Sequence, residues 1–182
     1  MAIRFAPTVE DILGIPEDGY RHELVYGVHH VSPAPGGVHQ LAVARLLLRL
    51  MLACPSTCEV LPAPFAWVVT DPDGERHEVQ PDLIVVTAEQ ARRPLLEDEL
   101  PRLVVEVLSP GAANQARDLE DKFGLYQAVG LPAYWVFDPM QTVLRAWRLI
   151  DGELVAVGET GHGECFETDW PWPLSLRPAD LG

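Results

Sequence analysis

Two acidic residues stand beside or inside the most apolar segments of the chain. Asp82 directly precedes Leu-Ile-Val-Val, and Glu106 lies within Leu-Val-Val-Glu-Val-Leu. A carboxylate in a buried strand is costly unless it is paired with a cation or bound to a metal. For Asp82 the alternative is a turn residue after Pro81, which would be favoured if Asp82 stood by itself. For Glu106 the alternative is a buried ion pair with an arginine. Two carboxylates on adjacent strands can together hold Mg²⁺ or Mn²⁺ through oxygen.

Such a metal centre suits phosphodiester hydrolysis. The metal neutralises the charge that develops on the phosphate and lowers the pKa of a bound water. A nearby lysine stabilises the transition state or orients the nucleophile. Lys122 is the only lysine among the 13 lysines and arginines, and Asp118 lies one helical turn before it. Asp118 could hold Lys122 by an i,i+4 pair, although an ordinary solvated salt bridge on a helix is the alternative.

The segments that must position these residues follow an α/β pattern. The continuous apolar runs 83–86 and 103–108 predict strands that are covered on both faces. Residues 38–53 predict a helix with Leu41, Ala44, Leu48 and Leu52 along one side. The other predicted elements are helices at 8–13 and 113–129, a hairpin of 22–25 and 28–31, and strands at 60–61, 65–69, 78–86, 134–137, 143–150 and 153–157. They predict a mixed sheet with helices on both sides.

A length of 182 residues fits one domain, 1–182, with a core at about 20–152. An N-terminal helix precedes this core, and a tryptophan-rich tail follows it and is expected to wrap the surface. The segment 1–10 lacks the apolar core of a signal peptide. The longest apolar stretch, 41–54, contains Arg45 and Arg49 and is too short to span a bilayer. The three cysteines lack the paired spacing of a zinc site, and we expect a cytoplasmic protein with reduced thiols.

Several short motifs along the chain resemble, in the expected order, the Uma-two family within the PD-(D/E)XK nuclease superfamily. They are Glu23-Leu-Val-Tyr-Gly, Ser32-Pro-Ala-Pro, His39-Gln, Gln80-Pro-Asp, Val104-Val-Glu-Val-Leu-Ser-Pro, Asp118-x-x-x-Lys122-x-x-x-Tyr126 and Pro132-Ala-Tyr-Trp-Val-Phe-Asp138. Several linked motifs are more specific than any one of them. The resemblance covers about residues 20–152 and implies a restriction-endonuclease-like fold, a mixed β-sheet flanked by helices.

The resemblance also implies roles for individual residues. Asp82 and Glu106 would be metal ligands, with Glu23 as an additional acid from the N-terminal segment. The superfamily's usual Glu-x-Lys would place its lysine where this chain has Leu108. The family pattern instead has a lysine on the following helix, which makes Lys122 the candidate catalytic lysine.

Other positions support or weaken this resemblance. Tyr26 stands where the family commonly has aspartate, and His29-His30 where it often has another acid or a hydrophobic residue. His39 begins the long helix and could face the cleft, cap the helix or lie on the surface. Tyr126 is expected to pack the helix against the sheet.

Three functions remain open from the sequence. The first is a Mg²⁺- or Mn²⁺-dependent endonuclease acting on DNA as a homodimer, with 65–67 and the tail as candidate contacts. The second is a non-catalytic binding or regulatory domain that retains the nuclease fold. The net charge of -14 supports it, because this is the wrong sign for holding DNA by its phosphates. The third is a hydrolase of small phosphate substrates, which tolerates an acidic surface better.

Overall fold

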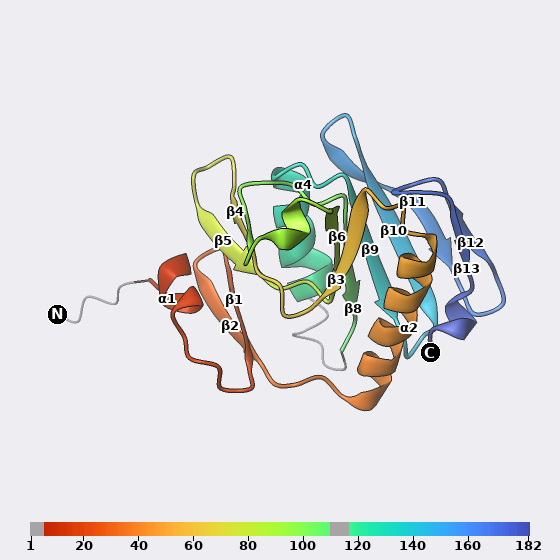
Figure 1. Cartoon of the computed structure of the whole chain (residues 1–182), viewed down its shortest axis with the longest axis horizontal. Coiled ribbons are helices and arrows are strands. Elements are labelled where there is room, and N and C mark those ends of the chain that lie inside the picture. The colour runs from red at the N-terminus through yellow and green to blue at the C-terminus, as the bar shows by residue number, and fades with distance from the viewer. Residues whose placement is uncertain (1–5, 110–116) are drawn as a thin grey trace.

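The computed structural model describes residues 6–109 and 117–182, and only the backbone of Arg117 and Asp118. The helical elements are α1 (Val9–Leu13), α2 (Gly37–Ala53), η1 (Gln90–Arg92), the π-helical turn η2 (Arg117–Asp121), α4 (Lys122–Ala128) and η3 (Pro178–Asp180). The strands are β1 (Arg21–Val25), β2 (Val28–Ser32), β3 (Cys58–Pro62), β4 (Trp67–Thr70), β5 (Arg76–Val79), β6 (Leu83–Thr87), β7 (Leu96–Glu97), β8 (Leu103–Val107), β9 (Ala133–Asp138), β10 (Val143–Ile150), β11 (Glu153–Thr160), β12 (Phe166–Thr168) and β13 (Leu174–Leu176). Figure 1 shows their arrangement.

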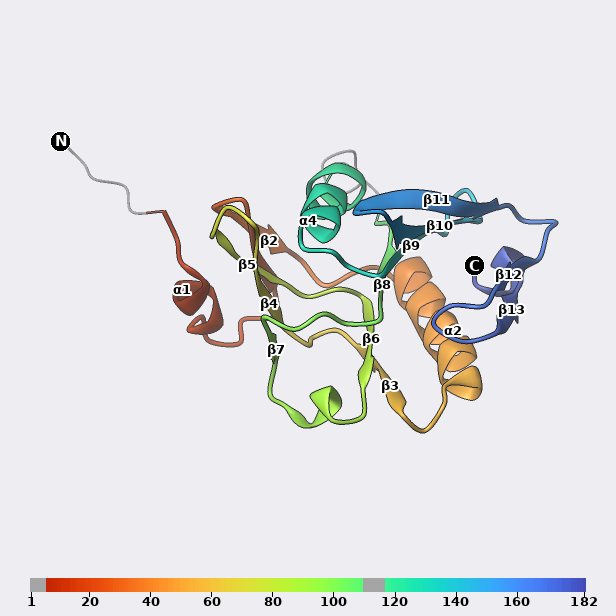
Figure 2. The same ribbon diagram turned by 90° about the horizontal axis from the view of Figure 1, so that it is seen from above.

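The six-stranded sheet has the order β11-β10-β9-β8-β6-β3. Strands β8 and β9 are parallel, whereas β6 runs antiparallel to β8. Helices α2 and α4 lie on opposite sides of this sheet (Figure 2). Alternate residues of β6 face the two helices, since Leu83 and Val85 belong to the α2-side core and Ile84 and Val86 to the α4-side core. The predicted mixed sheet with helices on both sides is confirmed.

A second sheet of five strands, β2-β1-β5-β4-β7, was not predicted. The segment 78–86, expected as one strand, is divided between the two sheets: β5 ends at Val79 and β6 begins at Leu83. The residues between them include Pro81, which has no N–H to donate to a strand ladder. Asp82 therefore lies where the chain crosses from one sheet to the other.

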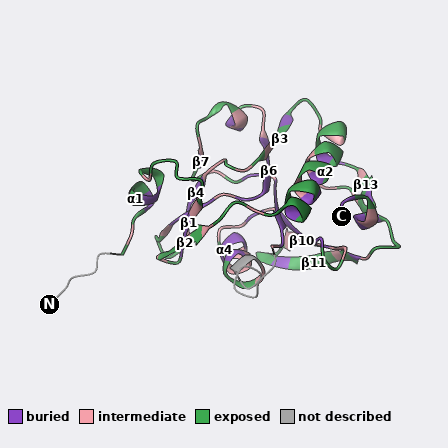
Figure 3. Cartoon of the chain, turned by 90° about the horizontal axis from the view of Figure 1, so that it is seen from below, coloured by how far each residue is buried: buried purple, intermediate pink, exposed green. Residues whose placement is uncertain are grey.

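The apolar side of α2 that was identified in the sequence is not the side that packs on the sheet. Leu41, Ala44, Leu48 and Leu52 are exposed, with exposed fractions of 56% for Leu48 and 75% for Leu52. The buried side carries His39, Ala42, Leu46 and Leu50 (Figure 3). Both sets have helical spacing, because apolar residues occupy most sides of this helix. Packing against the sheet selects the second set, and this orientation turns His39 inward.

The C-terminal tail does not simply wrap the surface as predicted. Its β12–β13 hairpin contributes Phe166, Trp172 and Leu176 to the core on the α2 side. The ring of Phe166 meets that of Trp135 edge to face, with centroids 5.0 Å apart. Trp67, in the other segment considered for dimer contacts, is also fully buried. Trp67 and Trp172 are therefore buried in the chain's own core.

The N-terminal hairpin forms as predicted, with β1 paired antiparallel to β2. Its two turn residues, Tyr26 and Gly27, have φ values of 49° and 67°. Tight hairpin turns with two positive φ values favour Asn-Gly or Asp-Gly, so Tyr26 is an unfavourable residue type here. Its backbone N–H donates to Nδ1 of the buried His77, 3.1 Å away, which helps to hold this turn.

The predicted helix 113–129 is described only in its second part, since 113–116 lie outside the described residues. From Arg117 the chain forms the π-helical turn and then α4, which ends at Ala128 before Gly130, where φ is 80°. None of the helices in the described ranges has the length and apolar character that a membrane crossing requires.

Candidate functional site

The predicted site residues come from separate elements that meet where the two sheets adjoin. Strand β1 provides Glu23, the crossover provides Asp82 and β8 provides Glu106. Helix α4 contributes Lys122 and Tyr126, and α2 contributes His39. The side chain of Asp118, expected to hold Lys122, lies outside the described residues. All the other predicted site residues belong to one connected set of contacts.

Lys122 joins two of the predicted acids. Its Nζ lies 2.8 Å from Oε1 of Glu23 and 2.8 Å from Oε1 of Glu106. The side chain is completely buried, so a solvated surface salt bridge does not describe it. Lys122 shares the buried side of α4 with Leu125 and Tyr126, three and four residues later. The packing of α4 on the sheet therefore carries the lysine to the strand carboxylates.

Glu106 is held from three directions. Besides Lys122, the Tyr126 hydroxyl donates to Oε1 at 3.2 Å and the Asp82 backbone N–H approaches Oε2 at 3.4 Å. The alternative considered for Glu106 was a buried ion pair with an arginine, and the ion pair that the structure shows is with a lysine. Leu108, at the superfamily's usual lysine position, is buried in the core on the α4 side. That space is filled by an apolar side chain, and the ammonium group arrives from the helix.

Tyr126 packs against the sheet as predicted and also makes a polar contact that was not predicted. Its ring stacks on Trp67, with centroids 5.5 Å apart, and meets Tyr134 edge to face at 5.1 Å. Two aromatic neighbours fix the ring plane, and the hydroxyl consequently has a defined direction toward Glu106.

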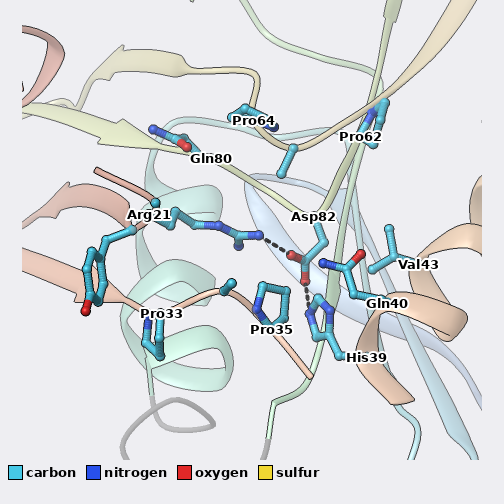
Figure 4. A pocket seen from close by; sticks show the side chains of 14 residues that line it. Arg21, Pro33, Pro35, His39, Gln40, Val43, Pro62, Pro64, Gln80 and Asp82 are labelled. Carbon is cyan, nitrogen blue, oxygen red and sulfur yellow. Dashed lines mark hydrogen bonds and ion pairs between the residues drawn. The ribbon is translucent and has the colours of Figure 1, made fainter. Parts of the chain in front are cut away.

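Asp82 is 3% exposed and accepts three hydrogen bonds, and Figure 4 shows the two from Arg21 and His39. Oδ1 accepts from Nη2 of Arg21 at 2.8 Å, while Oδ2 accepts from Nε2 of His39 at 3.0 Å and from the Val107 N–H at 2.8 Å. Burial acts to raise the pKa of Asp82, but the His39 hydrogen bond and the Arg21 charge outweigh it and lower the pKa. Asp82 is therefore ionised at neutral pH.

Glu23 is also buried, with 1% exposure. Its Oε1 accepts the backbone N–H of Gln80 at 2.9 Å, in addition to its contact with Lys122. Glu23 was implied by the family resemblance alone. The pairing of β1 with β5 brings it beside the crossover, a contact between segments far apart in the sequence.

Three residues of the site were missed at the level of sequence. The sequence does indicate that Arg21 could belong to the site, because it lies two residues before Glu23 and alternate strand residues share a face. Gln80 lies in the motif Gln80-Pro-Asp, but no role was predicted for it. Its Nε2 donates to Oε1 of Glu78 at 3.0 Å. Glu78 is fully buried, and burial is the main cause that raises its pKa to about 7, with the Glu23 charge adding to the effect.

A pocket of about 250 Å³ opens directly above Asp82. Its polar lining includes Arg21, His39, Gln40 and Gln80, and four prolines form much of its wall, namely Pro33, Pro35, Pro62 and Pro64 (Figure 4). Glu23, Glu106 and Lys122 are not among the lining residues and are buried. Asp82 is thus the predicted acid that borders the open space.

The chemistry of these side chains fits a hard divalent cation. Among the described side chains that meet here, the carboxylates Glu23, Asp82 and Glu106 outnumber the permanent cations Arg21 and Lys122. Buried carboxylate oxygens are ligands that Mg²⁺ and Mn²⁺ prefer. The carboxylate oxygens are now in contact with side-chain cations, which would have to shift as an ion entered.

A second group with metal-binding potential lies on the β4–β5 hairpin. Asp71, Glu75 and His77 each offer a ligand atom within 4.8 Å of the others. Glu23, Asp82 and Glu106 do not form so compact a group in the described part of the chain. His77 is already engaged, since Nε2 contacts Oδ2 of Asp71 at 3.2 Å and Nδ1 accepts a backbone N–H.

Comparisons with known proteins agree with the fold and the motifs. The model of the Uma2 family, described as "Putative restriction endonuclease", matches residues 9–173. A crystal structure of "a putative nuclease belonging to DUF820" from Anabaena variabilis ATCC 29413 is similar, with a TM-score of 0.69 and 17% sequence identity. The alignment covers 96% of this chain and 97% of that one, and shows a shared fold. No curated protein matches the chain. The family match over most of its length establishes that the chain belongs to the Uma2 family of restriction-endonuclease-like proteins.

Proposed function

We propose that this protein is a Mg²⁺- or Mn²⁺-dependent endonuclease that hydrolyses DNA phosphodiester bonds with a lysine supplied by a helix. The buried contact of Lys122 with Glu106 and Glu23, at 2.8 Å each, is the observation that carries the proposal. Membership of a family of restriction-endonuclease-like proteins supports a nuclease. The metal dependence, the role of the lysine and the DNA substrate are inferred from the chemistry of the side chains at the site.

In this proposal Asp82 and Glu106 hold the metal, with Glu23 as the additional acid. The metal, when bound, supplies positive charge for the phosphate and a water of lowered pKa. His39 and the Val107 N–H keep the Asp82 carboxylate in one orientation.

Lys122 and Tyr126 have separate tasks in this site. The Lys122 ammonium lies against Glu106, and we assign it the role of donating to the attacking water or to the phosphate once Glu106 has taken up the metal. Tyr126 holds Glu106 through its hydroxyl, so we assign it a positioning role.

The direct test is incubation of the purified protein with plasmid and with single-stranded DNA in Mg²⁺ or Mn²⁺. We expect cleavage by the wild type and a loss of cleavage in Asp82→Asn and Lys122→Met. Asp151→Asn is a matched control, because Asp151 is an exposed turn residue whose φ of 51° asparagine tolerates. An inactive wild type, or equal cleavage by Asp82→Asn, would sink the proposal.

A hydrolase of small phosphate substrates is the second candidate. The net charge of -14 and the limited pocket volume of about 250 Å³ favour it. Hydrolysis of bis-p-nitrophenyl phosphate without any cleavage of DNA would select this function. Failure of both Mg²⁺ and Mn²⁺ to bind, measured by calorimetry, would instead favour a non-catalytic binding or regulatory domain that retains the nuclease fold.

We also propose that the protein acts as a homodimer, since cutting both DNA strands is simplest with two sites. Of the tryptophans first considered as dimer contacts, Trp67 and Trp172 are buried within the chain and Trp170 is half-buried. Light scattering at micromolar concentration tests the assembly, and a monomer mass would contradict it.

A further inference from the structure

The two oxygens of Asp82 are committed to different kinds of partner. Oδ2 accepts the Val107 backbone N–H at 2.8 Å and Nε2 of His39 at 3.0 Å. Both donors are fixed, because Val107 is part of β8 and His39 is 6% exposed on the inner side of α2. Oδ1 has a single described partner, Nη2 of Arg21 at 2.8 Å. Oδ1 is therefore the oxygen of Asp82 that a ligand can reach by displacing a side chain.

Arg21 is the side chain in this set that has room to move. Its side chain is 20% exposed and lines the pocket of about 250 Å³, whereas Lys122 is fully buried between two carboxylates. Its guanidinium group carries a permanent positive charge and lies 2.8 Å from Oδ1 of Asp82. Arg21 thus supplies positive charge at the place where the proposed function needs a metal.

A divalent cation and a guanidinium group on the same carboxylate oxygen repel each other at a buried position, which favours movement of the side chain that has room to move. Once displaced, the guanidinium group has the adjoining pocket to enter. Gln40 and Gln80 are among the polar residues that line this pocket. A planar guanidinium group matches the oxygens of a phosphate in a bidentate manner, which an ammonium group does not.

We propose that Arg21 is a latch that occupies Asp82 until a divalent metal displaces it, and that the displaced side chain then binds a phosphate group in the pocket. This inference rests on the proposed function, since it requires the metal at Asp82. It adds a sequence of events to that function: the metal binds first and releases Arg21, and Arg21 then holds the substrate. Arg21 consequently lowers the affinity for the metal and raises the affinity for the phosphate.

The test compares Arg21→Gln with Arg145→Gln. Arg145 is a matched control because it is also partly exposed, forms one ion pair, with Glu159 at 3.0 Å, and its loss changes the net charge equally. Mn²⁺ affinity is measured from the free-ion EPR signal. Affinity for a fluorescein-labelled duplex oligonucleotide is measured by anisotropy in Ca²⁺, with circular dichroism to verify folding.

We expect Arg21→Gln to bind Mn²⁺ about tenfold more tightly than the control and the oligonucleotide about tenfold more weakly, as the loss of a charge-assisted hydrogen bond implies. Mn²⁺ binding that requires Asp82 but is no tighter in Arg21→Gln overturns the latch and leaves the proposed function standing. An unchanged oligonucleotide affinity overturns the phosphate contact. An absence of Mn²⁺ binding in every variant overturns both the latch and the metal-dependent function.

A measurement on the wild type makes the test independent of the folding of the variant. The Nε–H resonances of the arginines are followed by NMR during a Mg²⁺ titration. The resonance of Arg21 is expected to shift as the metal binds, while that of Arg145 stays in place. Saturation with Mg²⁺ and an unmoved Arg21 resonance would overturn the latch.

Discussion

At the residue scale, the acids of the site could be predicted better than the cations that balance them. Asp82 and Glu106 stand out because an ionised group beside an apolar run needs a partner. Lys122 stands out as the only lysine. Arg21 is one of many arginines, and its contact with Asp82 depends on a fold that brings together residues 61 positions apart.

Glu78 could not be predicted as part of the site. It precedes Asp82 in a segment of mixed polarity, and nothing in that pattern indicates that its side chain is buried. Its Oε2 has no hydrogen-bond partner among the residues that the structure describes. The low polarity around it follows from the packing of the two sheets, which is a property of the tertiary structure.

Lys122→Met is expected to destabilise the protein as well as inactivate it. The substitution leaves Glu23 and Glu106 buried without their shared cation, and removing one partner of a buried ion pair costs about 3–5 kcal/mol. Urea denaturation measures the change in the free energy of unfolding. Arg145→Met, which breaks a more exposed pair, is expected to cost at most about 1 kcal/mol. Equal losses in the two variants would contradict the buried pairing.

Glu78 is expected to make stability fall as the pH rises from about 4.5 to about 7. Its pKa in the folded protein is raised to about 7 from the ordinary 4.5, so in this interval the folded state binds the proton and the unfolded state releases it. The full difference corresponds to up to about 3 kcal/mol. Glu78→Gln removes this titration and flattens the profile of unfolding free energy against pH. A variant profile as steep as that of the wild type would contradict the buried, protonated carboxyl.

At the element scale, the strands of the central sheet were predictable because continuous apolar runs require cover on both faces. The division of 78–86 between two sheets was harder to anticipate, although Pro81 marks the break. The sequence did not identify the buried side of α2, because two sets of residues with helical spacing compete on a helix that is apolar on most sides.

The orientation of α2 gives a paired prediction. Leu46 is fully buried against the sheet, whereas Leu48 is 56% exposed. Leu46→Ala is expected to lower the free energy of unfolding by about 2–5 kcal/mol through lost contacts and a cavity. Leu48→Ala should change it by no more than about 0.5 kcal/mol. Urea denaturation of both variants checks which side of the helix is buried, and the reverse order of losses would instead indicate burial of the side with Leu41, Ala44, Leu48 and Leu52.

At the scale of the whole molecule, the site exists because two sheets meet at one crossover. The five-stranded sheet supplies Arg21 and Glu23, and the six-stranded sheet supplies Glu106. The pairing of β1 with β5 and of β4 with β7 joins segments that local patterns cannot relate. The family resemblance placed Glu23 near the other acids, which composition and periodicity alone did not.

The part of the chain that the structure describes also contains two places where a metal could bind. One is the predicted centre at Asp82 and Glu106, and the other is the hairpin group of Asp71, Glu75 and His77. The hairpin group is the more compact of the two, but it is not among the residues that line the pocket above Asp82. The position of a bound ion therefore shows which of the two places binds the metal.

A crystal structure of the protein soaked in Mn²⁺, with anomalous diffraction data, tests the central claim most directly. The account predicts an anomalous peak that contacts Oδ1 of Asp82 and a carboxylate oxygen of Glu106, with the Arg21 side chain turned into the pocket. A peak only at Asp71, Glu75 and His77, or Asp82 still paired with Arg21 at saturating Mn²⁺, would contradict it.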